Sequence, residues 1–502
     1  MRSNLKTALF LFIFFFSIYS LFMSGHLYSP DEEIMYRTTE SLGKSHTLAI
    51  QPLADEGDRF TDKDSQGRFY GHYGIGQSLW ALPFWGAGQI ISPFFPDQGL
   101  YAFRPSTAIA YHGHTPQEYW NRYFVSRMGQ VTTALACVMI FLIALQLGYS
   151  SKNGFLISLF YGLGTMAFPF SKTFYSEPTV TLFLLLAFYH LCRFQNSNLR
   201  KHLMIAGCWV GAALLTRVDT IILIPSFILY LLYPVLTAPS DKSKWKNFWS
   251  NALVSGIPLI IAGLLVALYN FIRFGSPTYT GYESEGLTFS FSMWDGLYGL
   301  LLSSGRGVVI YSPLVLLFFP AIKHFWQEHK QQALLCILII LSYVLFYSKW
   351  ESWAGGWTWG PRHIYQIHAF LIIPVLALLK QQDKRFNMFF WIPLGLLALG
   401  SLYIQIPALL VSFMDYHFYY QSIGPLHEIL YIPVRSPLAG HWAILTDKTA
   451  DLFYYQLWKT PVSIGLKLGF LIYLIGLAVS SGYLYSRIFS KKAPVAGDEG
   501  MR

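Results

Sequence analysis

Long apolar segments recur along the chain, and they constrain its fold more than any other feature. About 20 apolar residues in a helix cross a bilayer. The sequence offers twelve such segments: 7–24, 122–148, 153–171, 176–193, 202–217, 219–236, 250–272, 307–323, 332–348, 363–380, 386–412 and 463–486. Only 12% of the residues are charged, against about 25% in soluble domains. The sequence therefore predicts an all-α polytopic membrane protein, in which 202–217 and 219–236 are either two spans or a re-entrant pair.

Basic residues are distributed unevenly between the segments that join these spans. If the N-terminus lies inside, the inner segments hold 18 basic and five acidic residues, and the remainder holds 18 basic and 21 acidic residues. This distribution follows the positive-inside rule, so we predict about twelve spans with both termini in the cytoplasm. The rule also accounts for the net charge of +10, so we expect no nucleic-acid partner.

Three long loops lie on the predicted outer side, at 25–121, 273–306 and 413–462. Loops of this length usually carry function. The chain lacks the sequence motifs of several common kinds of site. It has no phosphate-binding P-loop, no H-E-x-x-H zinc motif and no C-x-x-C pair. Candidate catalytic and binding residues must therefore be sought at the outer ends of the spans.

Carboxylates occur at two outer span ends. The first group includes Asp31 and Glu32, directly after the first span. Ser29 and Glu32 also form an S-x-x-E capping box, so a short helix explains these residues equally well. The second is Glu177, which opens the fourth span. An ionisable group at membrane depth is a functional-site candidate by default, although Glu177 also suits a helix cap beside Ser176.

Arginines on the outer side have no explanation in the positive-inside rule. Arg306 and Arg362 each lie beside glycine or proline, and Arg217 lies in a very short turn. A guanidinium binds phosphate through two parallel hydrogen bonds, so we predict that these arginines bind a substrate phosphate. Pairing with nearby carboxylates or lipid phosphates is the alternative. Trp357 belongs to a tryptophan-rich run that suits either an interfacial belt or the stacking of sugars and isoprenoids.

Four segments together resemble a known family: PDEEIMYRTTESL from residue 30, GRFYGHYGIGQSLWALPFWGAG from 67, YSEP from 175 and WAGGWTWGPRHIYQIHAFLIIP from 353. They are similar to the membrane glycosyltransferases of the GT-C fold. The specific likeness is to bacterial relatives of the dolichyl-phosphate-mannose protein mannosyltransferases and the 4-amino-4-deoxy-arabinose lipid A transferases. The resemblance implies a catalytic module over 1–412, whose long first outer loop contains short amphipathic helices. An outer loop over 413–462 and a last span with its cytoplasmic tail over 463–502 follow.

The resemblance also implies an activity. Such enzymes move a sugar from a polyprenyl-phosphate donor to a hydroxyl of a lipid, glycan or protein at the outer face of the membrane. The base corresponds to Asp31, with Glu32 as the second candidate and Glu177 as a further catalytic carboxylate. From the same segments we expect sugar or lipid contacts from Tyr36, His72, Trp357 and His363. We expect a bacterial inner-membrane location.

The chemistry of such a transfer gives further expectations. A base at the membrane edge should have a raised pKa, and the leaving phosphate needs positive charge but no general acid. A single displacement inverts the anomeric centre. The sequence requires no cofactor, although a divalent metal at Asp31 and Glu177 is compatible with it. A transporter or flippase for a lipid-linked sugar, and an enzyme like an O-antigen ligase or polymerase, are the alternative functions.

Overall fold

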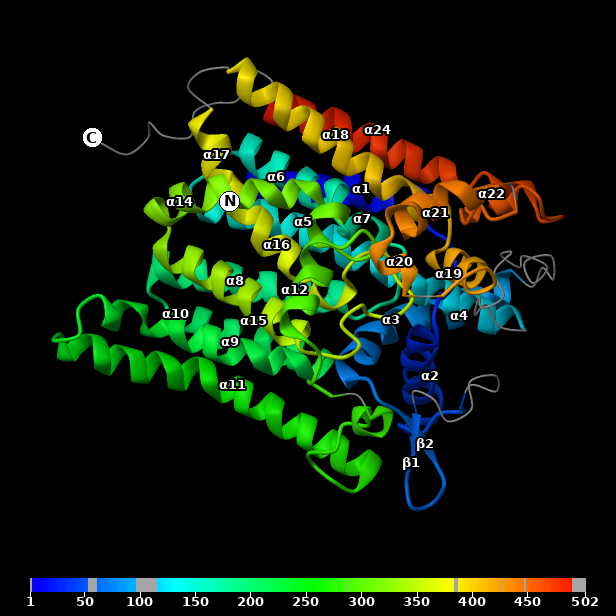
Figure 1. Cartoon of the computed structure of the whole chain (residues 1–502), viewed down its shortest axis with the longest axis horizontal. Coiled ribbons are helices and arrows are strands. Elements are labelled where there is room, and N and C mark those ends of the chain that lie inside the picture. The colour runs from blue at the N-terminus through cyan, green and yellow to red at the C-terminus, as the bar shows by residue number, and fades with distance from the viewer. Residues whose placement is uncertain are drawn as a thin grey trace.

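The computed structural model describes residues 2–52, 61–95, 115–286, 288–382, 387–425, 427–446 and 448–489, and it is mainly helical (Figure 1). Seven helical stretches in this part of the chain are long and apolar enough to cross a membrane. They are α1 (Arg2–Leu21), α4–α5 (Pro116–Ser126 and Met128–Gln146), η3–α10 (Val218–Leu223 and Ile224–Leu236), α11 (Lys242–Phe274), α15 (Lys330–Ser348), α18 (Met388–Leu410) and α23–α24 (Ile464–Lys467 and Phe470–Ile488).

The other predicted spans contain shorter or less apolar helices, several of them interrupted. They are α6 (Ser151–Gly164), α7 (Ala167–Phe170), α8 (Glu177–Ser197), α9 (Lys201–Thr216), α13 (Val308–Tyr311), η5 (Pro313–Leu317), α14 (Phe318–Glu328), η6 (Arg362–Ile364), α16 (Ile367–Ile372), η7 (Ile373–Val375) and α17 (Leu376–Gln381). A multi-helix membrane fold is therefore confirmed, whereas the number of twelve spans stays a prediction.

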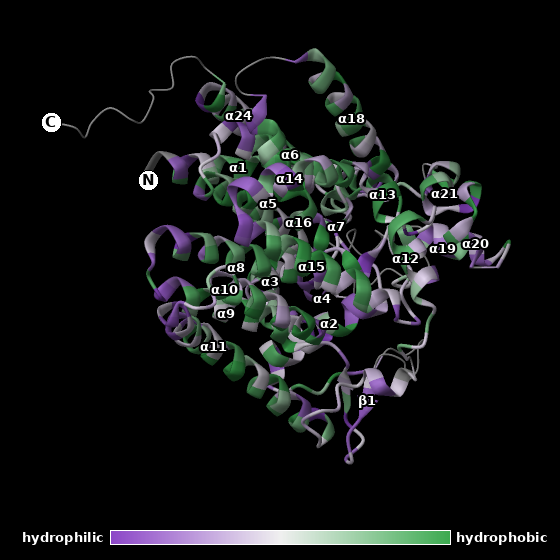
Figure 2. Cartoon of the chain, turned by 60° about the vertical axis from the view of Figure 1, so that its left-hand side comes forward, coloured by the Kyte–Doolittle hydropathy of each residue, from purple (hydrophilic) through white to green (hydrophobic). Residues whose placement is uncertain are grey.

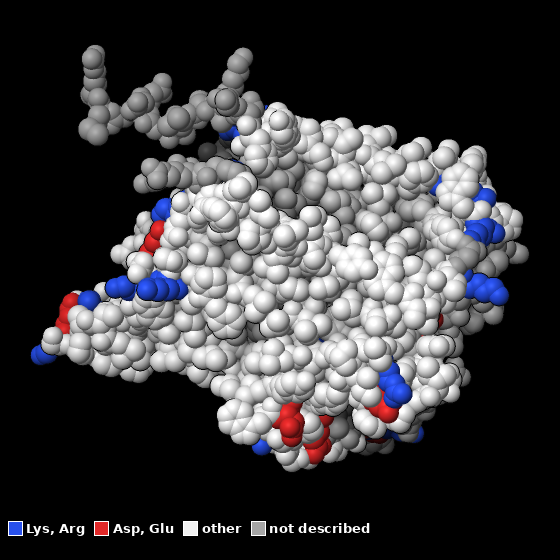
Figure 3. All heavy atoms as spheres, turned by 45° about the horizontal axis from the view of Figure 1, so that its top comes forward, with Lys and Arg blue, Asp and Glu red and all other residues white. Residues whose placement is uncertain are grey.

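The first and last long helices pack side by side in opposite directions. Phe10 of α1 stacks on Tyr483 of α24, and Phe16, further along α1, contacts Tyr473. The N-terminal end of α1 and the C-terminal end of α24 therefore lie at the same end of the molecule. Helices such as α11 and α18 are largely exposed and green in the hydropathy view, as lipid-facing helices should be (Figure 2). On the face shown in Figure 3, charged side chains lie near the edges and leave a broad uncharged band between them.

The three predicted outer loops lie at the end of the molecule opposite the N-terminal end of α1, on the right of Figure 1. They contain α2 (Pro30–Ser45), β1 (Thr61–Lys63), β2 (Phe69–Gly71), α3 (Ile75–Ile91), η1 (Ser92–Phe94), η4 (Tyr282–Glu285), α12 (Met293–Leu302), α19 (Phe413–Gln421), α20 (Glu428–Tyr431), η8 (Pro433–Arg435), α21 (Pro437–Ile444) and α22 (Phe453–Leu457). The strands β1 and β2 form an antiparallel hairpin in which Asp62 pairs with Tyr70. This hairpin is a small addition to the predicted all-α fold.

Helix α3 packs closely against the end of α9. A Cβ atom added at Gly74 or Gly76 would lie within 2.8 Å of the Thr216 or Leu215 backbone, so only glycine permits this approach. The contact brings the first outer loop against the membrane helices at the turn that contains Arg217.

Candidate functional site

A cavity of about 890 Å³ lies where the outer loops meet the ends of the membrane helices. Its walls come from segments far apart in the sequence. They include the start of α2, the residues that join β2 to α3, the linker before α8, the turn after α9, the end of α11 and the loop between α15 and α16. Several of the site residues predicted from the sequence line this cavity.

The predicted capping box is present at the start of α2. The Ser29 hydroxyl accepts from the Glu32 amide, the Glu32 carboxylate accepts from the Ser29 amide at 3.3 Å, and Pro30 occupies the first turn. This cap fixes the first turn of α2, and Asp31 within it lines the cavity. The structure thus places Asp31 at the cavity wall through local helix-start chemistry.

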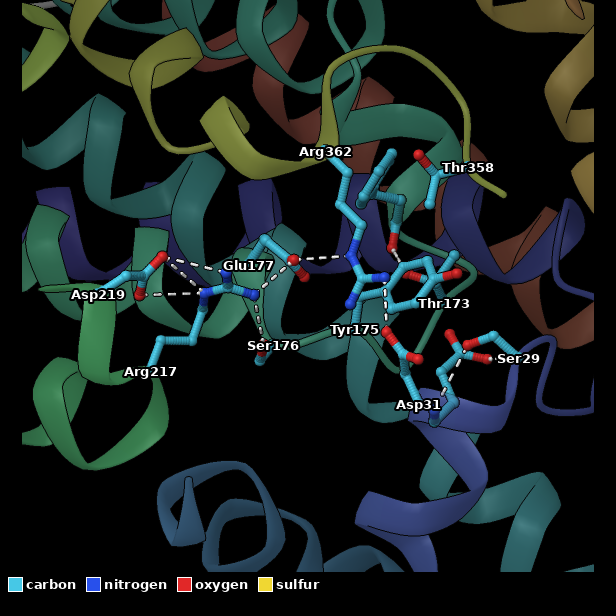
Figure 4. Close-up of polar contacts among 12 residues, drawn as sticks. Ser29, Asp31, Thr173, Tyr175, Ser176, Glu177, Arg217, Asp219, Thr358 and Arg362 are labelled. Carbon is cyan, nitrogen blue, oxygen red and sulfur yellow. Dashed lines mark hydrogen bonds and ion pairs between the residues drawn. The ribbon is translucent and has the colours of Figure 1, made fainter. Parts of the chain in front are cut away.

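Arg362 connects the two predicted acidic segments (Figure 4). Its Nη1 donates to Asp31 Oδ2 at 2.7 Å, and its Nε donates to Glu177 Oε1 at 2.8 Å. The guanidinium also lies 3.8 Å from the centre of the Tyr175 ring. Asp31 and Glu177 are 146 positions apart in the sequence, and Arg362 brings them into one site.

Arg217 extends this connection on the other side of Glu177. Its Nη1 donates to Glu177 Oε1 at 2.7 Å, and its Nη2 donates to Asp219 Oδ2 at 3.0 Å. The Tyr347 hydroxyl donates to the same oxygen of Asp219. Carboxylates and guanidiniums therefore alternate along the row drawn in Figure 4, which consists of Asp31, Arg362, Glu177, Arg217 and Asp219.

The pKa of Asp31 is shifted in the direction opposite to the one predicted. Burial raises the pKa of this carboxyl, but the charge and hydrogen bond of Arg362 outweigh burial, and the pKa is lowered. The prediction of a raised pKa for a base at Asp31 is therefore wrong, because it left out the arginine that only the fold brings near. Asp31 is ionised at neutral pH, and 18% of its side chain is exposed.

Glu32 has a different environment from its neighbour. It is fully buried and is absent from the cavity wall. Its carboxylate accepts from the backbone amides of Tyr28, Ser29 and Phe174, the last at 2.7 Å. Burial raises the pKa of Glu32 to about 7 despite these bonds. Its contacts join the segment before α2 to the linker before α8, which is a bracing function rather than that of a base.

Two further predicted residues lie outside the cavity wall. Glu177 is fully buried behind the two arginines, and its other oxygen has no hydrogen-bond partner among the described residues. Its carboxylate binds arginine side chains instead of capping α8. Arg306 donates to the carbonyls of Gly305, Ala354 and Gly356, each at 2.8 Å. It holds the loop before α16 and does not line the cavity, contrary to the predicted phosphate contact.

The four predicted sugar or lipid contacts divide into two groups. His72, Trp357 and His363 line the cavity, where His363 stacks on Tyr347 with 4.7 Å between ring centres. Tyr36 is fully buried in α2 and packs under the guanidinium of Arg122 instead. Tyr36 is therefore not placed to contact a ligand in the cavity.

A metal ion at Asp31 and Glu177 does not fit this arrangement. The guanidinium of Arg362 lies between the two carboxylates and binds both. No group of three or more His, Cys, Asp or Glu side chains suited to a metal occurs among the residues that the structure describes. We therefore assign no step of the chemistry to a metal at these two residues.

From the sequence, Arg273 is one more outer arginine that the positive-inside rule does not explain, and neither it nor Asp219 was predicted as a site residue. Asp219 lies two residues after Arg217, and this spacing was its only local signal. Arg273 ends α11 and lines the cavity with 2% of its surface exposed. It donates to the Gly71 carbonyl and to Asn270 Oδ1, and its guanidinium lies 3.8 Å from the Tyr269 ring centre. Its Nε has no hydrogen-bond partner among the described residues, and no ion pair with a carboxylate is found for it there.

Comparisons with known proteins agree with this fold. Residues 121–267, which include Glu177 and Arg217, match the family described as dolichyl-phosphate-mannose-protein mannosyltransferase. No curated protein sequence matches the chain. Among solved structures, the oligosaccharyltransferase of Archaeoglobus fulgidus in complex with Zn and sulfate is similar with a TM-score of 0.52 at 12% identity, over 90% of this chain and 61% of that chain. Its apo form gives 0.50 at 11% identity, over 90% and 64%.

The ArnT protein of Cupriavidus metallidurans bound to undecaprenyl phosphate is also similar, with a TM-score of 0.47 at 13% identity, over 97% of this chain and 72% of that chain. The match to the oligosaccharyltransferase supports the fold that the four sequence segments imply. The chain is therefore a multi-pass membrane protein with the GT-C fold of membrane glycosyltransferases, and over residues 121–267 it matches the dolichyl-phosphate-mannose-protein mannosyltransferase family.

Proposed function

We propose that this cavity transfers a sugar from a polyprenyl-phosphate donor to a hydroxyl acceptor, at the outer face of the membrane. One observation carries the proposal: the cavity combines an ionised carboxylate, Asp31, with Arg273, an arginine that has no carboxylate partner among the described residues. A base and a phosphate-binding cation are the two charged groups that such a transfer requires.

Arg273 is better suited to a donor phosphate than the arginines predicted from sequence. Arg217 and Arg362 line the cavity, but each is bound to two carboxylates. Arg306 is bound to backbone carbonyls. A buried guanidinium with an unused donor makes a strong, charge-assisted hydrogen bond to a phosphate oxygen. We therefore assign the leaving phosphate to Arg273.

The cavity also has an apolar wall suited to the carrier lipid. Ile221 and Phe289 line the cavity and are 53% and 45% exposed, so they face both the cavity and the outside. Phe346 and Trp350 continue this wall, and Phe289 lies 4.7 Å from each of their ring centres. Ile221 belongs to a membrane-spanning stretch, so an isoprenoid chain can pass between the cavity and the bilayer without crossing water.

The reaction follows from these positions. The acceptor hydroxyl attacks the anomeric carbon and gives its proton to Asp31, while the bond to the phosphate oxygen breaks and Arg273 stabilises the phosphate released. Because the pKa of Asp31 is lowered, its carboxylate takes the proton only as the hydroxyl becomes acidic in the transition state. One displacement inverts the anomeric centre, and retention in the product would refute this mechanism.

The test uses the purified chain in lipid with a panel of labelled polyprenyl-phosphate sugars and hydroxyl acceptors. We expect release of free polyprenyl phosphate together with a glycosylated acceptor, and a large loss of both in Asp31→Asn. Donor binding without release, in the presence of acceptors that span lipids, glycans and peptides, would instead favour transport of a lipid-linked sugar. The expected location in a bacterial inner membrane, with cytoplasmic termini, is tested separately by labelling from each side.

A further inference from the structure

The last outer loop, residues 413–462, reaches the site through one buried carboxylate. Asp451 is 5% exposed and lies just before α22. Its Oδ1 accepts from His26 Nε2 at 2.8 Å. Its Oδ2 accepts from the Tyr28 hydroxyl at 2.6 Å and from Lys172 Nζ at 3.0 Å. Two of these partners precede α2 and the third precedes α8, so a single side chain binds two separate segments.

The same two segments are also joined through Glu32. The Tyr28 amide and the Phe174 amide both donate to the Glu32 carboxylate. Four hydrogen bonds and the backbone from Lys172 to Phe174 therefore close a ring that runs from Asp451 through Tyr28, Glu32 and Phe174 to Lys172 and back. A closed ring holds the two segments at two points, so neither segment can shift along the other without breaking buried bonds.

The two segments that this ring holds carry the two carboxylates that Arg362 binds. Asp31 lies one residue before Glu32, and Glu177 lies three residues after Phe174. Arg362 spans the gap between these carboxylates, with 2.7 Å and 2.8 Å contacts. Hydrogen bonds of this length are lost when the two segments move apart by about 1 Å. The ring thus sets the separation on which the Asp31–Arg362–Glu177 contacts depend.

We propose that Asp451 is a positioning residue for the transfer reaction, through which the last outer loop fixes Asp31 against Arg362. The expected loss of kcat rests on the proposed function. The expected positioning of the two segments rests on the hydrogen-bond ring alone. The loop makes further contacts with the site, because Met414 lines the cavity and His417 stacks on Trp357 at 4.0 Å. The cavity is therefore incomplete without this loop.

The test compares Asp451→Asn and Tyr28→Phe with the control Glu428→Gln. Tyr28→Phe removes one hydroxyl and leaves its ring packed on Phe413. Glu428→Gln breaks the ion pair with Arg435 within the same loop, away from both held segments. In Asp451→Asn we expect kcat to fall by about 100-fold, with the donor KM unchanged. The acidic limb of the kcat–pH profile should move to higher pH, because Asp31 loses the alignment with Arg362 that lowers its pKa. Tyr28→Phe should show the same changes to a smaller extent.

A readout independent of activity separates this inference from the proposed function. Amide hydrogen exchange should become faster in peptides 26–34 and 170–178 of Asp451→Asn and Tyr28→Phe, and stay native in the control. If the native chain transfers no sugar, the proposed function fails, and the exchange result still decides whether the ring holds these segments. Native exchange in both variants overturns the inference. So does a fall in activity that leaves the pH profile unmoved, because that result describes a smaller folded fraction.

Discussion

Replacing Asp31 with asparagine should remove the base while leaving the site in place. The new side chain can still accept the hydrogen bond that Arg362 donates at 2.7 Å, so the row of charged groups keeps its geometry. Loss of a positioned base lowers kcat by about 10²–10⁴, or roughly 3–5 kcal/mol of transition-state stabilisation. Donor affinity should change little, because Arg273 and the apolar wall are unaltered. We therefore expect the loss in kcat and not in KM.

The assay is release of free polyprenyl phosphate at saturating donor, with Glu40→Gln as the matched control. Glu40 belongs to the same helix and is absent from the cavity wall, so its replacement changes the same charge outside the site. Loss of rate through protonation of Asp31 itself should begin only below about pH 4, because the pKa of Asp31 is lowered from an ordinary value near 3.9. Equal kcat in Asp31→Asn and Glu40→Gln would refute the assignment of Asp31 as the base.

Three other changes test separate parts of the site. Arg273→Met should raise the donor KM by about 10–100-fold, from the loss of a charged hydrogen bond of roughly 1.5–3 kcal/mol, and an unchanged KM would exclude a phosphate contact. Arg306→Met leaves three carbonyls without their donor, so thermal unfolding should show a loss of about 3 kcal/mol or more. A raised KM with native stability would instead restore its predicted phosphate contact. Burial, followed by the charge of Asp451, raises the pKa of Asp415 to about 7. Its protonated form is therefore favoured by folding, and this stabilisation is complete below about pH 4 and lost as the pH rises to about 7. Asp415→Asn should weaken the fall in melting temperature between pH 5 and 8, and an identical fall would contradict this account.

Local features of the site were predictable from the sequence. The capping box at Ser29 and Glu32 and the outer-end position of Glu177 each depend on residues within one helical turn. Each of the four family segments likewise contributes residues to the cavity wall, although the turn after α9 and the end of α11 lie outside them. Hydrophobic length predicted a membrane fold, because the bilayer sets the length of a spanning helix.

Pairings between distant residues were not predictable. Arg306 and Arg362 have similar neighbours in the sequence, yet one binds backbone carbonyls and the other binds carboxylates. Arg273 differs from both only because the fold brings no described carboxylate to it. The lowered pKa of Asp31 has the same origin, since its partner lies 331 positions away. Tertiary contacts thus decide the chemistry of side chains whose local surroundings look alike.

The spread of the charged row along the chain also bears on how this protein is made. Asp31 emerges early in synthesis, whereas Arg362 follows more than 300 residues later, after most of the membrane helices. Until that arginine is inserted, Asp31 lacks its counter-charge, whereas Glu177 already has Arg217 as a partner. A nascent chain that stops before residue 362 therefore presents Asp31 as an unpaired acidic group at the membrane edge, and in this respect an unfinished chain differs from a finished one.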